Sequence, residues 1–204
     1  MVRARGVFAI LAGATVLVAG CGTPQQHPIA RESEQIGTQP VCCASFRDMP
    51  FVALHAAQKR TFVIDTDTPV YAFRDGRSRF VAVRLPAAPA SLRVRSNVIT
   101  AWVEPTTFDP FVTFLDGGYQ SLGESALPTR VAAESGARFL EGEIRVPRGA
   151  AFAVLYTKPA VYLTKRREGP PPLVVGAQSM SIPMTSFVVA GPRGELVLEA
   201  TGRD

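Results

Sequence analysis

Short apolar runs and turn residues alternate along most of the chain, about one turn every 8–12 residues. The segment 91–96 is the clearest example, because Leu92 and Val94 fall on one face of a strand while Arg93 and Arg95 fall on the other. The same pattern predicts strands at 60–65, 70–73, 78–85, 91–96, 99–104, 111–115, 138–146, 151–157, 159–164, 186–190 and 195–199.

The turns between these runs indicate how the strands connect. Gly191-Pro-Arg-Gly194 lies between two β-branched runs and predicts a hairpin that joins the last two strands. Helical signal is thin: residues 51–59 could form two turns, and residues 165–172 are expected to be a loop. The pattern therefore predicts an all-β fold, an antiparallel two-sheet β-sandwich of the jelly-roll type.

The N-terminus follows a different pattern. Arg3 and Arg5 precede an apolar stretch from Val7 to Ala19, which is too short to span a bilayer as a helix of about 20 residues. Small residues then lead directly to Cys21. Residues 1–20 are therefore expected to be a lipoprotein signal peptide, cleaved before a Cys21 whose thiol carries a diacylglyceryl group.

Lipidation at Cys21 determines the expected compartment. Acyl chains anchor a protein firmly when two or more insert into the membrane, so the chain is expected to be membrane-bound. Gly22 stands where Asp usually signals retention in the inner membrane, which favours an outer-membrane location facing the periplasm. Residues 21–40 are polar, with Pro and Gly, and are expected to be a flexible linker of about 25 Å. The β-sandwich is then assigned to residues 41–204.

Charge and cysteine content narrow the functional classes. Removing the two leader arginines lowers the formal net charge from +5 to +3, which argues against nucleic acid as a partner. Cys42 and Cys43 remain as an adjacent pair in an oxidising compartment. Three interpretations stay open: a vicinal disulfide, two buried or half-buried thiols, or a redox or metal role. No cofactor is indicated.

Catalytic constellations are weakly indicated. His55 lies among alanines without a nearby nucleophile motif, so it is interpreted as a structural histidine. Two acidic pairs have the i, i+2 spacing that places carboxylates on one face of a strand: Asp65 with Asp67, and Glu141 with Glu143. They are interpreted as solvated strand or turn residues. A calcium site that uses Asp65, Asp67 or Asp116 is a weaker alternative. The chain is therefore expected to be non-enzymatic.

Aromatic residues offer candidates for a ligand site. Trp102 is the single tryptophan and lies in a predicted strand, where a core position is expected. Tyr119 follows the turn Asp116-Gly-Gly118 and is expected to be exposed. Both are kept as candidate carbohydrate-binding residues. Lys165-Arg-Arg167 is expected to be a solvated loop, with contact to anionic lipid head groups as the alternative.

A series of segments from residue 42 onward carries a recognisable pattern: Cys42-Cys-Ala-Ser-Phe46, Phe62-Val-Ile-Asp65, Val70-Tyr-Ala-Phe73, Gly76, Ser78, Phe80–Pro86, Phe108–Asp116, Glu141–Val146 and Ala153–Thr157. Together they resemble the MalM family, the maltose operon periplasmic proteins and their lipoprotein relatives. The resemblance covers residues 42–200 and rests on strand and turn patterns rather than catalytic residues.

The resemblance implies an envelope protein that is linked in some members to maltodextrin uptake, and it supplies no functional residues. Together with the lipidation signal, it leads us to expect an accessory or binding protein in carbohydrate uptake, with a carbohydrate or an outer-membrane transport protein as partner. The alternative is an envelope scaffold that binds another protein and no sugar.

Overall fold

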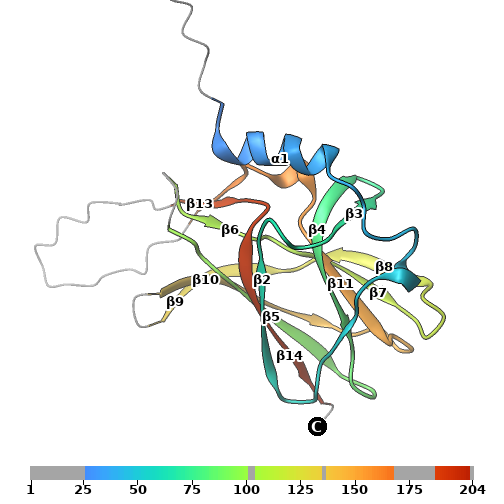
Figure 1. The fold of residues 1–204 in the computed structure, drawn as a ribbon. Coiled ribbons are helices and arrows are strands. Elements are labelled where there is room, and N and C mark those ends of the chain that lie inside the picture. Colours follow the sequence, from blue (N-terminus) through green and yellow to red (C-terminus); the bar gives the residue numbers. More distant parts are fainter. Residues whose placement is uncertain (1–25, 101–103, 135–136, 168–186, 203–204) are drawn as a thin grey trace, which may run out of the picture.

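The computed structural model describes residues 26–100, 104–134, 137–167 and 187–202. Within these ranges the regular secondary structure is almost entirely strand (Figure 1). The elements are α1 (Pro28–Thr38), η1 (Phe46–Asp48), β1 (Val52–Ala53), β2 (Lys59–Ile64), β3 (Val70–Phe73), β4 (Gly76–Arg84), β5 (Ser91–Asn97), β6 (Thr106–Thr107), β7 (Phe111–Leu115), β8 (Ser121–Ala126), β9 (Thr129–Glu134), β10 (Ala137–Arg145), β11 (Phe152–Tyr156), η2 (Pro159–Val161), β12 (Lys165–Arg167), β13 (Phe187–Ala190) and β14 (Gly194–Thr201).

The strands form two large sheets and one small sheet. The six-stranded sheet has the order β1-β4-β11-β7-β8, with β3 paired to β4; the five-stranded sheet has the order β2-β14-β5-β10-β9. The small sheet has the order β12-β13-β6. Pairing is antiparallel except between β1 and β4 and between β13 and β6. The predicted all-β sandwich is thus confirmed.

The main core lies between the two large sheets. Val81 and Val83 of β4 point into it from the six-stranded sheet, and Leu92 and Val94 of β5 point into it from the five-stranded sheet. The alternation in 91–96 therefore correctly predicted the buried side of β5. Further core residues come from β2, β7, β11 and β14: Ile64, Val112, Phe114, Ala153, Leu155, Leu196 and Leu198.

The six-stranded sheet is covered on its outer side as well. Residues Ser78–Val83 of β4 are all buried, so this strand is covered on both faces instead of alternating between buried and exposed positions. Phe80 and Ala82 face away from the main core into a second apolar cluster. Tyr156 and Phe152 of β11 belong to the same cluster. The outer side of this sheet is therefore an aromatic-rich, partly covered surface.

The N-terminal segment corrects the prediction of a flexible linker over 21–40. Residues 28–38 form α1, which packs over β4 at one end of the sandwich (Figure 1). Ile29 and Ile36 bury their side chains, and the carboxylate of Glu32 pairs with Arg79 of β4 and with Arg193. An isolated helix shorter than about 12 residues is marginal in water, so this docking stabilises α1.

The predicted hairpin at 191–194 is also corrected. β13 pairs with β6 and β12, whereas β14 pairs with β2 and β5, so the turn carries the chain from one sheet to another. Gly194 permits this passage, because a Cβ there would lie 2.6 Å from the Cβ of Phe108. The turn was predicted correctly, but the strand pairing was wrong.

Three shorter predictions are replaced. Residues 51–59 contain β1 and a connection with a turn at 55–58 instead of two helical turns, because Val52–Ala53 pairs with β4. Pro159–Val161 forms a 3-10 turn in place of a strand. Lys165–Arg167 forms β12 in place of a loop, paired with β13. Strands β8 and β9, which have little apolar alternation, were not predicted.

Candidate functional site

Nine aromatic rings gather on the outer side of the six-stranded sheet, and we call this surface the aromatic face. Three of the rings are buried on the sheet itself, and six are partly exposed around them. The buried rings are Phe80, Phe152 and Tyr156; the partly exposed rings are Phe46, Phe51, Tyr71, Phe73, Phe111 and Tyr119. The sheet places the rings of β3, β4, β7 and β11, because residues two apart on a strand share a face. Phe46, Phe51 and Tyr119 come from connecting segments that pack against them.

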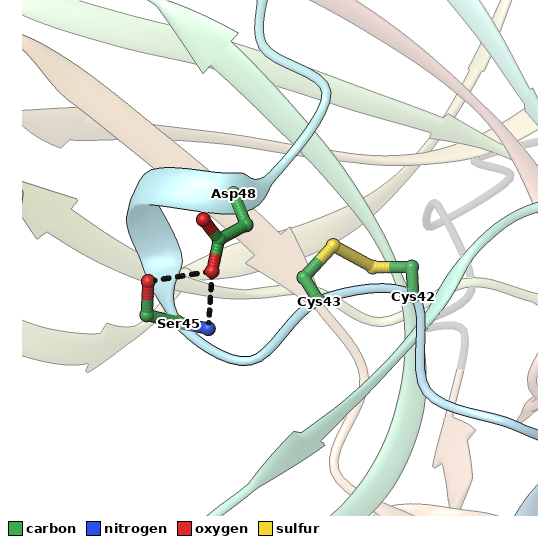
Figure 2. Close-up of a disulfide and its surroundings, with 4 residues drawn as sticks. All are labelled: Cys42, Cys43, Ser45 and Asp48. Carbon is green, nitrogen blue, oxygen red and sulfur yellow. Dashed lines mark hydrogen bonds between the residues drawn. A yellow bond between two sulfur atoms is a disulfide. The ribbon is translucent and has the colours of Figure 1, made fainter.

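Residues 42–51, which we call the cover segment, pack over this face without forming a sheet layer of their own. Cys42 and Cys43 form a disulfide across a trans peptide, with Cα atoms 3.8 Å apart (Figure 2). Cys42 donates its backbone N–H to the carbonyl oxygen of Val70 at 2.8 Å. The Cys43 side chain is buried in the aromatic cluster. Of the three interpretations of this pair, the disulfide is the one observed.

A capping box between Ser45 and Asp48 also fixes the cover segment, just after the disulfide. The Asp48 carboxylate accepts hydrogen bonds from the Ser45 backbone N–H at 3.0 Å and from its hydroxyl at 2.8 Å (Figure 2). This capping box begins the 3-10 turn η1 and satisfies donors that the turn leaves free. The turn holds Phe46 where its ring stacks on Tyr71, with centroids 5.4 Å apart.

One end of the aromatic face is built around Tyr119. Its ring stacks on Phe152, with centroids 4.7 Å apart, and Phe51 contacts both rings. Tyr119 has a φ of 65°, a left-handed conformation that is uncommon outside glycine. Asp116 braces this turn, because its carboxylate accepts N–H groups of Gly118 and Gln120, each at 2.8 Å. The expectation of an exposed Tyr119 is therefore corrected: it lies on a turn but is half-buried against other rings.

The basic groups at the Tyr119 end come from two elements. The Cζ atom of Arg47, in the cover segment, lies 5.7 Å from the Tyr119 ring centroid. The Cζ atom of Arg84, at the end of β4, lies 5.6 Å from the Phe152 ring centroid. Both arginines are exposed, and neither forms a salt bridge with a carboxylate among the described residues.

The other end is built around Tyr156. Its ring lies parallel to Phe73 at 3.7 Å, and its hydroxyl donates to the carboxylate of Glu124. Burial, aided by the Glu124 charge, raises the pKa of Tyr156 above the ordinary value. Lys158 pairs with Asp75 at 2.6 Å and with Glu124, which together raise the Lys158 pKa. The cation at this end is thus matched by two carboxylates.

The two histidines lie away from the aromatic rings. His55 is exposed in the connection after β1, as expected of a structural histidine. His27 caps α1, because its Nδ1 accepts the backbone N–H of Ile29 at 3.2 Å. Among the described residues, no cluster of three or more His, Cys, Asp or Glu side chains has a geometry that could hold a metal ion.

The acidic pairs singled out in the sequence are used in other ways. Asp65 caps the turn after β2, where it accepts the N–H of Asp67 at 3.0 Å. Glu141 and Glu143 lie on the outer side of β10, where each pairs with an arginine, Arg130 and Arg93 respectively. The structure does not bring the two pairs together. This arrangement matches their interpretation as solvated strand and turn residues.

The basic run 165–167 is engaged by acids where the structure describes it. Lys165 pairs with Glu104 at 2.9 Å, and Arg166 pairs with the largely buried Asp109 at 2.6 Å. Trp102, the second candidate for carbohydrate binding, and Cys21, the predicted lipidation site, lie outside the described residues.

A separate hollow of about 370 Å³ lies on the five-stranded sheet, and it offers few unpaired polar groups for a ligand. Its Arg95 lies over the Phe139 ring at 3.4 Å and pairs with Glu134 at 3.0 Å. The lining residues are Arg95, Asn97, Val98, Thr100, Ala137 and Arg138. We therefore take the aromatic face as the candidate site.

Comparisons with models of protein families, with curated proteins and with solved structures give no match. The resemblance to the MalM family therefore stays a prediction. In the part of the chain that the structure describes, no helix combines the length and apolar character needed to cross a membrane.

Proposed function

We propose that this chain is a non-enzymatic, lipid-anchored accessory protein of carbohydrate uptake that faces the periplasm from the outer membrane. In this proposal the aromatic face binds the saccharide. The observation that carries the proposal is the gathering of six partly exposed rings on one side of the six-stranded sheet. The lipidation signal at Cys21 supports the location, and the MalM resemblance supports maltodextrins as the first ligands to test.

The chemistry of the aromatic face suits a saccharide. The C–H faces of sugar rings pack on aromatic side chains, and the hydroxyls require polar partners at the margin. Phe46, Phe51 and Tyr119 supply partly exposed rings, with Arg47 beside Tyr119. Lys158 supplies a polar group beside Phe111 at the other end of the face. Contacts with Phe51 and Phe152 hold the Tyr119 ring in place before binding, which lowers the entropic cost of binding.

Calorimetric titration of the purified full chain with maltotriose and longer maltodextrins tests the proposal. Tyr119→Ala is expected to weaken binding about tenfold, which corresponds to about 1.4 kcal/mol. Phe187→Ala is the matched control, because Phe187 is an exposed aromatic residue (41%) on β13, outside the aromatic face. A flat titration of the unmodified chain with neutral and acidic oligosaccharides would contradict saccharide binding.

The anchor is tested separately. Cys21→Ser is expected to release the protein from the membrane fraction into the soluble periplasmic fraction, because the thiol that would carry the lipid is lost. Cys42→Ser combined with Cys43→Ser leaves Cys21 intact and is expected to stay membrane-bound. Continued membrane association of Cys21→Ser would show that the anchor is assigned to the wrong residue.

A protein-binding scaffold is the second candidate, favoured by β8. This strand is the edge of the six-stranded sheet, all six of its residues are exposed, and Leu122 projects with 41% of its surface accessible. An open edge can pair with a strand of another protein. Leu127 donates its N–H to Pro110 beside β7, so the N–H of the preceding residue, Ala126, faces the open edge. Ala126→Pro would remove that donor, and it should abolish a stoichiometric partner found by crosslinking without changing any saccharide affinity.

A further inference from the structure

The two ends of the aromatic face differ in charge. At the Tyr156 end, the cation Lys158 pairs with the carboxylates of Asp75 and Glu124. At the Tyr119 end, Arg47 and Arg84 flank a stacked pair of rings, and the structure pairs neither of them with a carboxylate among the described residues. The Tyr119 end therefore combines an apolar platform with two uncompensated positive charges.

We infer that the Tyr119 end of the aromatic face selects a saccharide that carries an anionic group, a carboxylate or a phosphate. The inference rests on the proposed function, which it deepens by naming the class of saccharide. Unpaired arginines are common on protein surfaces, and Arg31 and Arg148 of this chain are exposed as well. What distinguishes Arg47 and Arg84 is that both lie over the same ring pair.

The geometry gives each group a separate role. A guanidinium within about 6 Å of a ring centroid is attracted to the ring, and its N–H groups can donate to a carboxylate or a phosphate. Arg47 lies beside Tyr119 and Arg84 lies beside Phe152, so the two guanidiniums flank one stack of two rings. A sugar ring placed on Tyr119, the partly exposed ring of this stack, would have its acidic substituent near these donors.

Hydrogen bonds hold the backbone at both arginines, so the fold fixes where each arginine begins relative to the ring pair. Arg84 lies in register with Phe152 on the neighbouring strand β11. Its carbonyl oxygen accepts the N–H of Leu54 at 2.9 Å, which holds β4 against the residue that follows β1. Arg47 lies within the 3-10 turn fixed by the Ser45–Asp48 capping box. Both backbones are therefore held by hydrogen bonds.

The test compares three ligands of equal ring number: maltotriose, trigalacturonate and a singly phosphorylated maltotriose. The full chain at 50 mM salt is expected to bind at least one acidic ligand ten or more times more tightly than maltotriose, and added salt should shrink that difference. Comparison of trigalacturonate with the phosphorylated maltotriose identifies which acidic group the site prefers. The double variant Arg47→Gln/Arg84→Gln is expected to remove the preference, so that neither acidic ligand binds more tightly than maltotriose.

Arg130→Gln is the matched control, because Arg130 is an exposed arginine on β9 of the other sheet, 81% accessible and paired with Glu141. It should keep the preference. Equal or tighter binding of maltotriose by the unmodified chain would overturn the inference and leave the proposed function standing, as would a preference that survives in the double variant. Failure to bind any of the three ligands would overturn both. Binding only to phosphatidylglycerol vesicles, lost in the double variant, would assign the arginines to a lipid surface and overturn the inference.

Discussion

The outer sides of the two large sheets carry different kinds of side chain. On the five-stranded sheet, arginines and glutamates of β5, β9 and β10 neutralise one another: Arg93 with Glu143, Arg95 with Glu134, and Arg130 with Glu141. On the six-stranded sheet, the corresponding side carries aromatic rings beneath the cover segment. One side is thus satisfied by water and ion pairs, whereas the other presents rings and two unpaired guanidiniums, Arg47 and Arg84.

This difference teaches how to distinguish a surface from a site. Exposed ion pairs contribute little to stability, so the five-stranded side should tolerate substitution. Rings packed under a cover contribute a great deal, so the six-stranded side should not. The following variants test that contrast, from the largest expected effect to the smallest.

Phe152→Ala should produce the largest loss. The ring is 6% exposed and contacts both Phe51 and Tyr119, so its removal leaves a cavity beneath the cover segment. The expected cost is about 3–5 kcal/mol in urea unfolding. Val63→Ala, at a 64% exposed position on the five-stranded sheet, is the comparison and should stay within about 0.5 kcal/mol. Similar losses for the two variants would show that the aromatic face is not packed as described.

Glu32→Gln should follow in size. Glu32 is 3% exposed and is the carboxylate that pairs with Arg79, itself 1% exposed. Removing one partner of a buried pair leaves an uncompensated charge, at a cost of about 3 kcal/mol. Undocking of α1 would limit this cost by letting water reach Arg79. Amide exchange should therefore show α1 opening while the β-sheet amides stay protected.

Glu34→Gln on the same helix is the control, because Glu34 is exposed and its carboxylate accepts a hydrogen bond from the neighbouring Gln26. It should leave α1 protected. If Glu32→Gln and Glu34→Gln exchanged alike, the docking of α1 would not depend on the buried pair.

α1 also marks the limit of prediction from sequence. The helix buries Ile29 and Ile36, which are too few apolar residues to distinguish it from a polar linker. Its third anchor, Glu32, depends on Arg79 and Arg193, which lie 47 and 161 residues away along the chain. No local pattern carries that information, so a flexible segment was the natural prediction.

The strands show the same division between local and long-range information. The segment 111–115 was predicted with the bounds that β7 has, and β5 was predicted from its alternation, because both signals are local. The partner of β13 was predicted wrongly, because sheet membership is decided by contact with β6 and β12. β8 was missed because its six residues are all exposed and carry no alternation.

The aromatic face was only partly foreseeable. Tyr119 was singled out because it follows a glycine-containing turn, and the structure does place it on that turn. Its contacts with Phe51 and Phe152 required the fold, because these residues lie on three separate segments of the chain. The disulfide was one of three interpretations of Cys42 and Cys43, and the sequence held no criterion to choose among them.

Tyr156→Phe should have a moderate effect that depends on pH. The variant removes a hydroxyl that donates to Glu124, and about 1 kcal/mol should be lost at pH 7. The pKa of Tyr156 is raised in the folded state, so the protonated hydroxyl stabilises the fold below the unfolded value near 10, and this stability is lost as pH rises further. Unfolding curves from pH 7 to 11 should therefore fall less steeply in the variant.

Tyr71→Phe serves as the control for this experiment. Tyr71 lies on the same aromatic face, and its hydroxyl makes no hydrogen bond with the described residues. It should follow the alkaline decline of the unmodified chain. If the stability of Tyr156→Phe fell as steeply with pH as that of Tyr71→Phe, the contact with Glu124 would not be the cause of the alkaline loss of stability.

Glu143→Gln should have the smallest effect and therefore sharpens the comparison most. Hydrogen bonds from Ser91 and then Arg93 lower the pKa of Glu143 in the folded state. Its stabilising effect is thus present above the unfolded value near 4.3 and lost as pH falls through the folded value. Thermal unfolding should show a slight decrease in midpoint at pH 7 that disappears at pH 2 and in 1 M salt. Because the Arg93–Glu143 pair is half-exposed, a loss as large as that of Glu32→Gln would mean that solvent does not screen this side, and the distinction between the two faces would fail.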